Sequence, residues 1–232
     1  MHAAETRQRV DLARAGFGTT TIRLLHRYGL LSERVLLSHA VHVDDEERAL
    51  LAAAGAAVVA SPAAEMKLGD GAAQFDAYRR AGITLALGTD AAVCNNGTDM
   101  LLECRMLGLL QKHAFGAGAM HAEAILCAAT QGGAAALGLG GVTGVVVPGR
   151  AADLVLIDAE NPRLQPLRWR GAHPNVVTNI VYAATGQDVT DVMIGGRWAV
   201  RRRRFVPADT KTLWRELRAA ARTLEPALDR WT

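Results

Sequence analysis

Residues 35–60 read VLLSHAVHVDDEERALLAAAGAAVVA. This stretch begins and ends with a short apolar run, at 35–39 and 57–60, and a third run, ITLAL, follows at 83–87. The three runs begin about 25 residues apart, which is the spacing of repeated β/α units. They are apolar throughout, as strands buried on both faces of a parallel sheet are. The stretch therefore predicts an α/β fold with a parallel sheet.

Helical patterns separate and follow these strands. Between the first two runs, Asp44 begins a predicted helix that carries acidic residues in its first turn, where the helix dipole favours them. Gly55 is its expected C-cap. A loop is expected after the second strand, through Pro62 and Gly69. Further helices are expected at 72–81, 100–110, 122–129 and 133–137.

The character of the sequence changes near residue 143. A strand is expected at 153–157, and VMIGGRWAV at 192–200 predicts a hairpin, because Gly195-Gly196 between short strands is a turn signal. Residues 210–224 have the pattern of an amphipathic helix. We therefore predict three parts, a β/α region at 1–143, a β-rich region at 144–206 and a C-terminal helix at 207–232.

Composition narrows the class of protein. The 232-residue chain is 50% hydrophobic and 21% charged, which excludes a disordered protein and provides for a sizeable core. No apolar run reaches the roughly 18 residues of a membrane span, and the first ten residues lack the apolar region of a secretory signal. Three cysteines without CxxC spacing argue against a disulfide framework. We therefore expect a cytoplasmic protein with no membrane partner.

The net charge of +3 is concentrated in a basic cluster made of Arg197 and the run 201–204. Basic side chains beside Trp198 and Phe205 are compatible with phosphate binding and base stacking. The alternative is a charged, solvated hairpin edge that prevents association between strands. We favour the hairpin edge and expect no nucleic-acid partner.

Ionisable residues lie where the predicted strands end. His39 closes the first strand, Asp90 follows the third, and His2 and Glu5 lie three residues apart near the start of the chain. Chemistry in parallel β/α folds collects at the ends of the strands, and imidazole and carboxylate groups are ligands of hydrolytic divalent ions. A further carboxylate can transfer protons to and from an activated water. Each residue also has a structural alternative, as a hydrogen-bonded histidine or a turn aspartate.

The sequences around these positions are more specific. They are HAAET (2–6), SHAVHV (38–43), SPAAEMKLG (61–69), ALGTDAAVCNNGTDM (86–100), LGLGGVTGVVVPGRAADLVLID (137–158) and NIVYAATGQDVTDVMIGGRWAV (179–200). In this order and spacing the chain resembles the amidohydrolase superfamily, and most closely its 5-methylthioadenosine/S-adenosylhomocysteine deaminase type. The resemblance implies the C-terminal half of a metal-dependent (β/α)8 TIM-barrel hydrolase, with 144–206 as part of a small β-sandwich.

The resemblance also implies roles for the residues at the strand ends. His2 corresponds to a metal ligand, and Glu5 to the carboxylate that protonates a ring nitrogen of the substrate. His39 matches the histidine that contacts the activated water or the substrate, and Asp90 matches the aspartate that binds the metal and deprotonates the water. The implied cofactor is a divalent ion, Zn²⁺ or alternatively Fe²⁺. The implied reaction is hydrolytic deamination of a purine nucleoside-type or related N-heterocyclic small molecule.

The chain departs from the family pattern in several ways. No HxH pair, which supplies two further metal ligands in the family, occurs in the sequence, and about four of the eight β/α units are present. Glu65 stands where relatives usually carry Asn, and Cys94 where Ser is common, and both are expected to contact substrate. Three interpretations stay open: a deaminase active in a longer chain, a triazine or guanine hydrolase of the same superfamily, or an inactive half-barrel. The family also implies a homo-oligomer.

Overall fold

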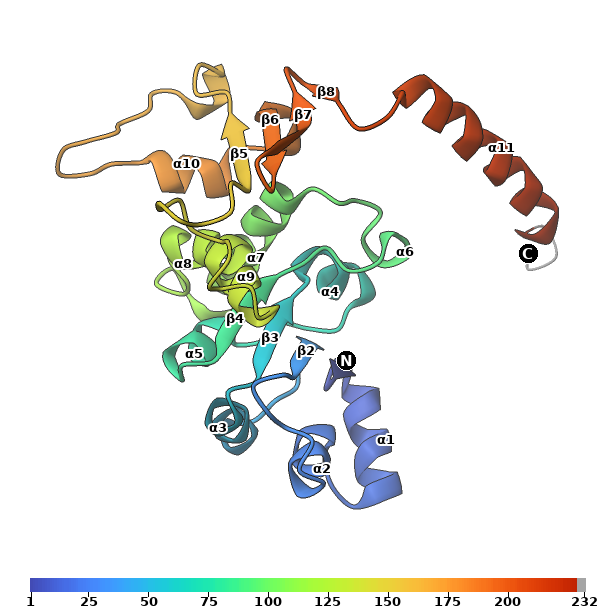
Figure 1. Ribbon diagram of the computed structural model, residues 1–232. Helices are drawn as coiled ribbons and strands as arrows, with labels where there is room; N and C mark the ends of the chain where they lie inside the picture. The colour runs from blue at the N-terminus through green and yellow to red at the C-terminus, as the bar shows by residue number, and fades with distance from the viewer. Residues whose placement is uncertain (229–232) are drawn as a thin grey trace. The chain divides into compact units, whose positions relative to one another are not determined.

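The computed structural model describes residues 1–228 of the chain (Figure 1). Contacts divide the chain into two compact units. The first unit contains residues 1–150 and 159–188, and the second contains residues 151–158 and the chain from 189 onward. Each unit contains one four-stranded sheet. Among the described residues, no helix combines the length and apolar composition needed to cross a membrane.

The sheet of the first unit is parallel, and its strands follow one another in chain order (Figure 1). It consists of β1 (His2–Ala3), β2 (Leu36–His39), β3 (Ala57–Ala60) and β4 (Thr84–Leu87). This confirms the three strands predicted from the apolar runs and the predicted α/β fold. Because the strands are parallel, the segments that follow them all leave from the same edge of the sheet.

Helices follow the strands of the first unit. In α3, the Asp44 side chain accepts from the backbone of Glu47, and the Glu47 side chain accepts from the backbone of Asp44. Gly55 ends this helix in the left-handed conformation, as predicted. The helices are α1 (Arg7–Phe17), α2 (Thr21–Arg27), α3 (Asp45–Ala54), α4 (Pro62–Leu68), α5 (Phe75–Arg80), α6 (Ala92–Asn95), α7 (Met100–Phe115), α8 (Ala122–Cys127), α9 (Gly133–Ala136) and α10 (Val176–Tyr182).

A π-helical turn at Ala128–Gly132 joins α8 to α9. The turn and α9 both pack against β4. A Cβ atom at Gly132 would lie 2.0 Å from the carbonyl oxygen of Leu85 in that strand. Glycine at this position therefore lets the helical backbone lie directly against the sheet. The helices predicted at 122–129 and 133–137 are thus parts of one nearly continuous helical run.

The core of the first unit lies between the sheet and these helices. Its strand side chains include Leu37 and Val58, neither of which is exposed. Apolar side chains from the surrounding helices complete the core, namely Ile22, Leu51, Phe75, Tyr78, Leu107 and Ile125. The apolar strand sequences are therefore covered by helices, as strands of a parallel sheet require.

The loop predicted through Pro62 and Gly69 is wrong, because this segment is the helix α4. Pro62 occupies the first turn, where a missing N–H costs no hydrogen bond, and the residues after it are good helix formers. Gly69 ends the helix with a φ of 75°. The helix predicted at 72–81 is shorter than expected and begins only at Phe75.

The two compact units divide the chain differently from the predicted boundary at residue 143. Residues 144–150 and 159–188 belong to the first unit. Residues 159–188 include α10, which packs against α7 and α8 and buries Val181 completely. The second unit therefore contains less of the region 144–206 than the sequence suggested.

The sheet of the second unit is antiparallel, and its strands also follow chain order. The predicted hairpin is confirmed, with Gly195 and Gly196 at φ values of 55° and 77° in its turn. Within the basic cluster, the Arg201 guanidinium lies 5.4 Å from the centroid of the Trp198 ring. The elements are β5 (Leu154–Ile157), β6 (Val189–Ile194), β7 (Arg197–Arg201), β8 (Arg204–Phe205) and α11 (Thr210–Leu228). Residues 229–232 of the predicted C-terminal part lie outside the described residues.

Candidate metal centre

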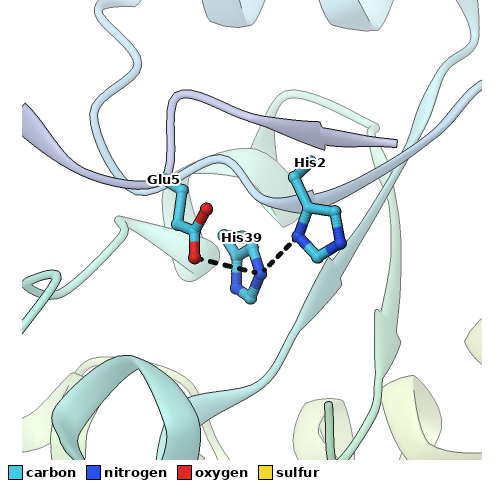
Figure 2. Close-up of side chains that lie close together, drawn as sticks. All are labelled: His2, Glu5 and His39. Atoms are coloured by element: carbon cyan, nitrogen blue, oxygen red, sulfur yellow. Dashed lines mark hydrogen bonds and ion pairs between the residues drawn. The ribbon is translucent and has the colours of Figure 1, made fainter. Parts of the chain in front are cut away.

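Two histidines meet at the edge of the parallel sheet where the strands end. His2 lies on β1 and His39 on the neighbouring β2, and the register pairs Ala3 with His39. Nδ1 of His2 lies 3.0 Å from Nε2 of His39, and the two rings are stacked with centroids 5.1 Å apart (Figure 2). His39 is buried, whereas His2 is exposed.

Two carboxylates approach the same nitrogen of His39. Oε1 of Glu5 lies 3.8 Å from Nε2 of His39, and Oδ2 of Asp90 lies 3.9 Å from it. Figure 2 shows His2 and Glu5 both directed toward this nitrogen. Ligand atoms of His2, Glu5 and His39 all lie within 4.8 Å of one another. The structure thus brings together the four residues that the sequence placed at the strand ends.

Left-handed backbone conformations gather at this edge of the sheet. Ala4 has a φ of 49°, His39 of 72°, Ala40 of 48° and Asp90 of 59°. Such conformations are uncommon for residues other than glycine, and they cluster at sites where the surrounding structure enforces them. Backbone hydrogen bonds stabilise the turns here, including one of 3.1 Å from Ala40 N–H to the Ala3 carbonyl.

Glu65 lies behind His39 and is completely buried. Its Oε1 atom lies 3.4 Å from Nδ1 of His39 and also accepts a 2.9 Å hydrogen bond from the Ser61 backbone N–H. A carboxylate at Nδ1 favours a proton there and leaves Nε2 facing the other site residues. The predicted substrate-binding residue Glu65 is therefore placed to orient His39.

The charges around His39 affect its pKa and that of Glu65. Desolvation lowers the pKa of His39, but the hydrogen bond to Glu65 and the negative charges of Glu65, Glu5 and Asp90 outweigh it and raise the pKa above its ordinary value. Burial raises the pKa of Glu65, and the hydrogen bonds from His39 and Ser61 oppose this rise. Oε2 of Glu65 is buried and has no partner among the described residues.

Cys94 lies on α6, directly after the segment that carries Asp90, and is half-buried. Desolvation and then the negative charge of Asp90 raise the pKa of the Cys94 thiol. The thiol is therefore an uncharged neighbour of Asp90. All six residues that the sequence singled out lie in one region of the first unit.

Two further acidic residues of this region escaped the sequence analysis. Asp70 is buried, and its Oδ2 atom has no partner among the residues that the structure describes. Burial and then the charge of Glu5 raise the pKa of Asp70. Glu103 is buried on α7 and accepts hydrogen bonds from Ala63 in α4 and Asn95 in α6. The sequence signal that could have identified them was an acidic residue in an unusual setting, namely Asp70 between two glycines and Glu103 on the largely apolar face of α7.

The donor set fits a divalent ion. Two ligand atoms bound to one tetrahedral zinc at 2.0–2.1 Å lie about 3.3 Å apart. The separations of 3.0, 3.8 and 3.9 Å around Nε2 of His39 bracket this value. Imidazole nitrogen and carboxylate oxygen are also the donor atoms that zinc and iron take in proteins. The arrangement is therefore suited to a metal ion with at least one carboxylate close enough to exchange protons beside it.

A sequence model of the amidohydrolase family matches residues 1–199. The chain belongs to the amidohydrolase family. A 5-methylthioadenosine/S-adenosylhomocysteine deaminase of Pelotomaculum thermopropionicum is 37% identical over 222 residues, which are 95% of this chain and 50% of that protein. The chain thus spans about half the length of the curated relatives it matches.

Solved amidohydrolase structures share the fold. An adenosine deaminase from Xanthomonas campestris with bound zinc is 37% identical, with a TM-score of 0.89 over 96% of this chain and 50% of that one. Atrazine chlorohydrolase TrzN from Arthrobacter aurescens TC1, complexed with zinc, is 29% identical, with a TM-score of 0.83 over 94% of this chain and 47% of that one. The predicted fold class, half of a (β/α)8-barrel hydrolase with part of a β-sandwich, is confirmed, and so is the relationship to hydrolytic enzymes.

Proposed function

We propose that this chain supplies metal-binding and proton-transfer residues of an amidohydrolase that deaminates a purine nucleoside-type small molecule by hydrolysis. The observation that carries the proposal is the convergence of His2, Glu5 and Asp90 on Nε2 of His39. The names of the deaminase relatives support the choice of reaction. Because the chain spans about half of those relatives, the proposed activity belongs to a protein that contains this chain together with further metal ligands.

His2 and Asp90 would hold the ion, and Nε2 of His39, which faces both of them, would be a further donor to the ion or to its water. Zinc is the proposed ion because both related structures contain it, and iron is the alternative that the same donor atoms allow. When bound, a divalent ion of this kind lowers the pKa of a water from 15.7 to about 7 and so supplies a nucleophile at neutral pH.

Asp90 would accept a proton from that water. Its Oδ1 atom accepts a 2.7 Å hydrogen bond from the backbone N–H of Ala91. Oδ2 is therefore the oxygen left for the site, and it is the one that faces His39. The hydrogen bond to Ala91 also fixes the rotation of the carboxylate, so that Oδ2 keeps its direction while it gains and loses a proton.

Glu5 would exchange a proton with the substrate. Its Oε1 atom faces His39 at 3.8 Å, while Oε2 forms an ion pair of 3.7 Å with Arg9. The Glu5 side chain is 16% exposed, so it can be reached from outside the protein. We assign it the transfer of a proton to a ring nitrogen of the substrate, and we assign His39 and Cys94 to contacts with the substrate or the attacking water.

The related TrzN structure makes a triazine hydrolase the second candidate. Both reactions would use the same residues, because each replaces a leaving group on an electron-poor ring carbon by water. The lower identity to TrzN, 29% against 37% for the adenosine deaminase, favours a purine nucleoside. We also propose that the protein containing this chain forms a homo-oligomer, as the family resemblance implies.

The test is a substrate panel on the zinc-loaded protein that contains this chain. It compares adenosine, 5′-methylthioadenosine, S-adenosylhomocysteine, guanine and a chlorotriazine by release of ammonia or chloride. Turnover of the adenine compounds, lost in Asp90→Asn and retained in His113→Asn, is expected, because His113 is an exposed histidine of α7. Turnover of the triazine alone, or turnover unchanged in Asp90→Asn, would contradict the proposal.

A further inference from the structure

Glu103 connects the two helices that follow β3 and β4 beside the candidate metal centre. It lies on α7 with 1% of its surface exposed. Its Oε1 atom accepts a 2.6 Å hydrogen bond from the Asn95 side-chain amide, and its Oε2 atom accepts a 3.1 Å bond from the backbone N–H of Ala63. Asn95 ends α6, which follows β4, and Ala63 lies in α4, which follows β3. Figure 1 labels the three helices that these hydrogen bonds join, and α4 contacts both α6 and α7.

The first connection reaches Asp90. The same amide nitrogen of Asn95 also donates a 2.6 Å hydrogen bond to the carbonyl of Thr89. Both of its hydrogens are then used, and because both partners are acceptors the amide can have only this orientation. The Thr89 carbonyl shares a peptide plane with the nitrogen of Asp90. Holding this carbonyl therefore constrains the rotation about φ of Asp90, which has the left-handed value of 59°.

The second connection reaches His39. Ala63 lies in the first turn of α4, two residues before Glu65. Glu65 in turn contacts Nδ1 of His39 at 3.4 Å. The buried carboxylate of Glu103 is therefore linked to both site residues through intermediate groups, to Asp90 by one series of contacts and to His39 by another. The facing atoms of Asp90 and His39 lie 3.9 Å apart.

We propose that Glu103 and Asn95 are positioning residues that hold Asp90 at its distance from His39. Glu103 orients the Asn95 amide, which holds the Thr89 carbonyl, and Glu103 also bonds to the first turn of α4. A non-glycine residue in the left-handed region needs support from its surroundings, and this network supplies it at Asp90. The inference rests on the proposed function in one respect, that Asp90 is a ligand of the metal ion.

Two variants separate positioning from a contribution to stability alone. Asn95→Ala removes both donors. The double variant Asn95→Asp with Glu103→Gln restores a hydrogen bond between the two side chains, because the amide introduced at position 103 donates to the carboxylate introduced at position 95. The amide oxygen still accepts from the backbone N–H of Ala63, but the Thr89 carbonyl is left without its donor. Gln111→Ala is the matched control, because Gln111 is a buried amide on the same helix that donates to the Ala73 carbonyl at 2.8 Å.

Each variant is titrated with Co²⁺ in the protein that contains this chain, its visible spectrum is recorded, and its melting temperature is measured. We expect the Co²⁺ affinity to fall about 10- to 100-fold in Asn95→Ala and in the double variant, with a changed spectrum. The double variant recovers part of the melting temperature lost in Asn95→Ala. Gln111→Ala lowers the melting temperature and leaves Co²⁺ affinity and spectrum unchanged.

Parental Co²⁺ affinity and spectrum in the double variant would overturn the proposal, since the tie to Thr89 would then have no effect on Asp90. A metal-free measurement separates this result from a failure of the proposed function. The backbone N–H of Ala91 donates to Asp90, and its hydrogen exchange is followed by NMR in the same variants. If the parent binds no Co²⁺, the proposed function fails. The positioning role then stands if this exchange accelerates in both Asn95 variants and not in Gln111→Ala, and it fails otherwise.

Discussion

Replacing Glu65 tests how His39 is held. Glu65→Leu removes the carboxylate from Nδ1 of His39, and Glu65→Gln keeps an acceptor at nearly the same place but removes the charge. A hydrogen bond to a charged group contributes about 1.5–3 kcal/mol, and the separation of 3.4 Å is long for such a bond. We therefore take the lower end, about 1.5 kcal/mol, which corresponds to a roughly tenfold loss of metal affinity in Glu65→Leu.

The two Glu65 variants differ in their expected effects on stability. Oε2 of Glu65 is buried without a partner among the described residues, and ionising a buried carboxyl group is unfavourable. Glu65→Gln removes that charge, so we expect it to unfold at the same temperature as the parent or higher. We expect its metal affinity to lie between those of the parent and Glu65→Leu.

The assay is a Co²⁺ titration by calorimetry and visible absorption, with a thermal unfolding curve for each variant. Asp76→Asn is the control, because Asp76 is another buried carboxylate of the first unit and pairs with Arg79 and Arg80. We expect this control to lose stability and to keep its Co²⁺ affinity. If Glu65→Leu bound Co²⁺ as tightly as the parent, with the same spectrum, the proposed orientation of His39 by Glu65 would be refuted.

Three further predictions concern the fold. Desolvation raises the pKa of Asp44, but the hydrogen bonds from the Glu47 backbone and Arg23 outweigh it and lower that pKa. The Asp44 charge therefore stabilises the folded state above the unfolded-state pKa of about 4, and this contribution is lost as the pH falls through the folded-state pKa. Asp44→Asn should therefore cost up to about 1 kcal/mol at pH 7 and less at pH 3, by urea unfolding. Gly132→Ala should give insoluble or unfolded protein, because its Cβ would lie 2.0 Å from a β4 carbonyl, and a folded variant with parental circular dichroism would contradict the packing of the π turn. Leu37→Ala should lower the free energy of unfolding by about 2–5 kcal/mol, and a loss below 1 kcal/mol would contradict its complete burial.

The sequence predicted those parts of the fold that have a local signal. The apolar strands, the acidic start of α3 and the Gly195-Gly196 turn are each specified by residues close together in the chain. The helix α4 has seven residues, too few for a clear helical period, and the glycine and proline at its ends are equally typical of a loop. The division into units also depends on distant contacts, since α10 joins the first unit by packing on α7 and α8.

The residues of the candidate site also differ in whether the sequence could predict their placement. His2, His39 and Asp90 could be grouped from the sequence because parallel strands end at one edge of a sheet. The placement of Glu65 behind His39 depends on the direction of α4, which no local pattern sets. Asp70 and Glu103 were missed because a buried acidic side chain on a loop or helix has the same sequence appearance as an exposed one.

The most direct test of the metal centre is the zinc content of the purified protein that contains this chain. It is measured by elemental analysis after dialysis, in the parent and in His2→Ala, Asp90→Ala and His113→Ala. We expect the parent and His113→Ala to retain zinc and both site variants to lose it, because His2 and Asp90 converge on Nε2 of His39. Zinc retained in both site variants, or absent from the parent, would contradict the proposed site.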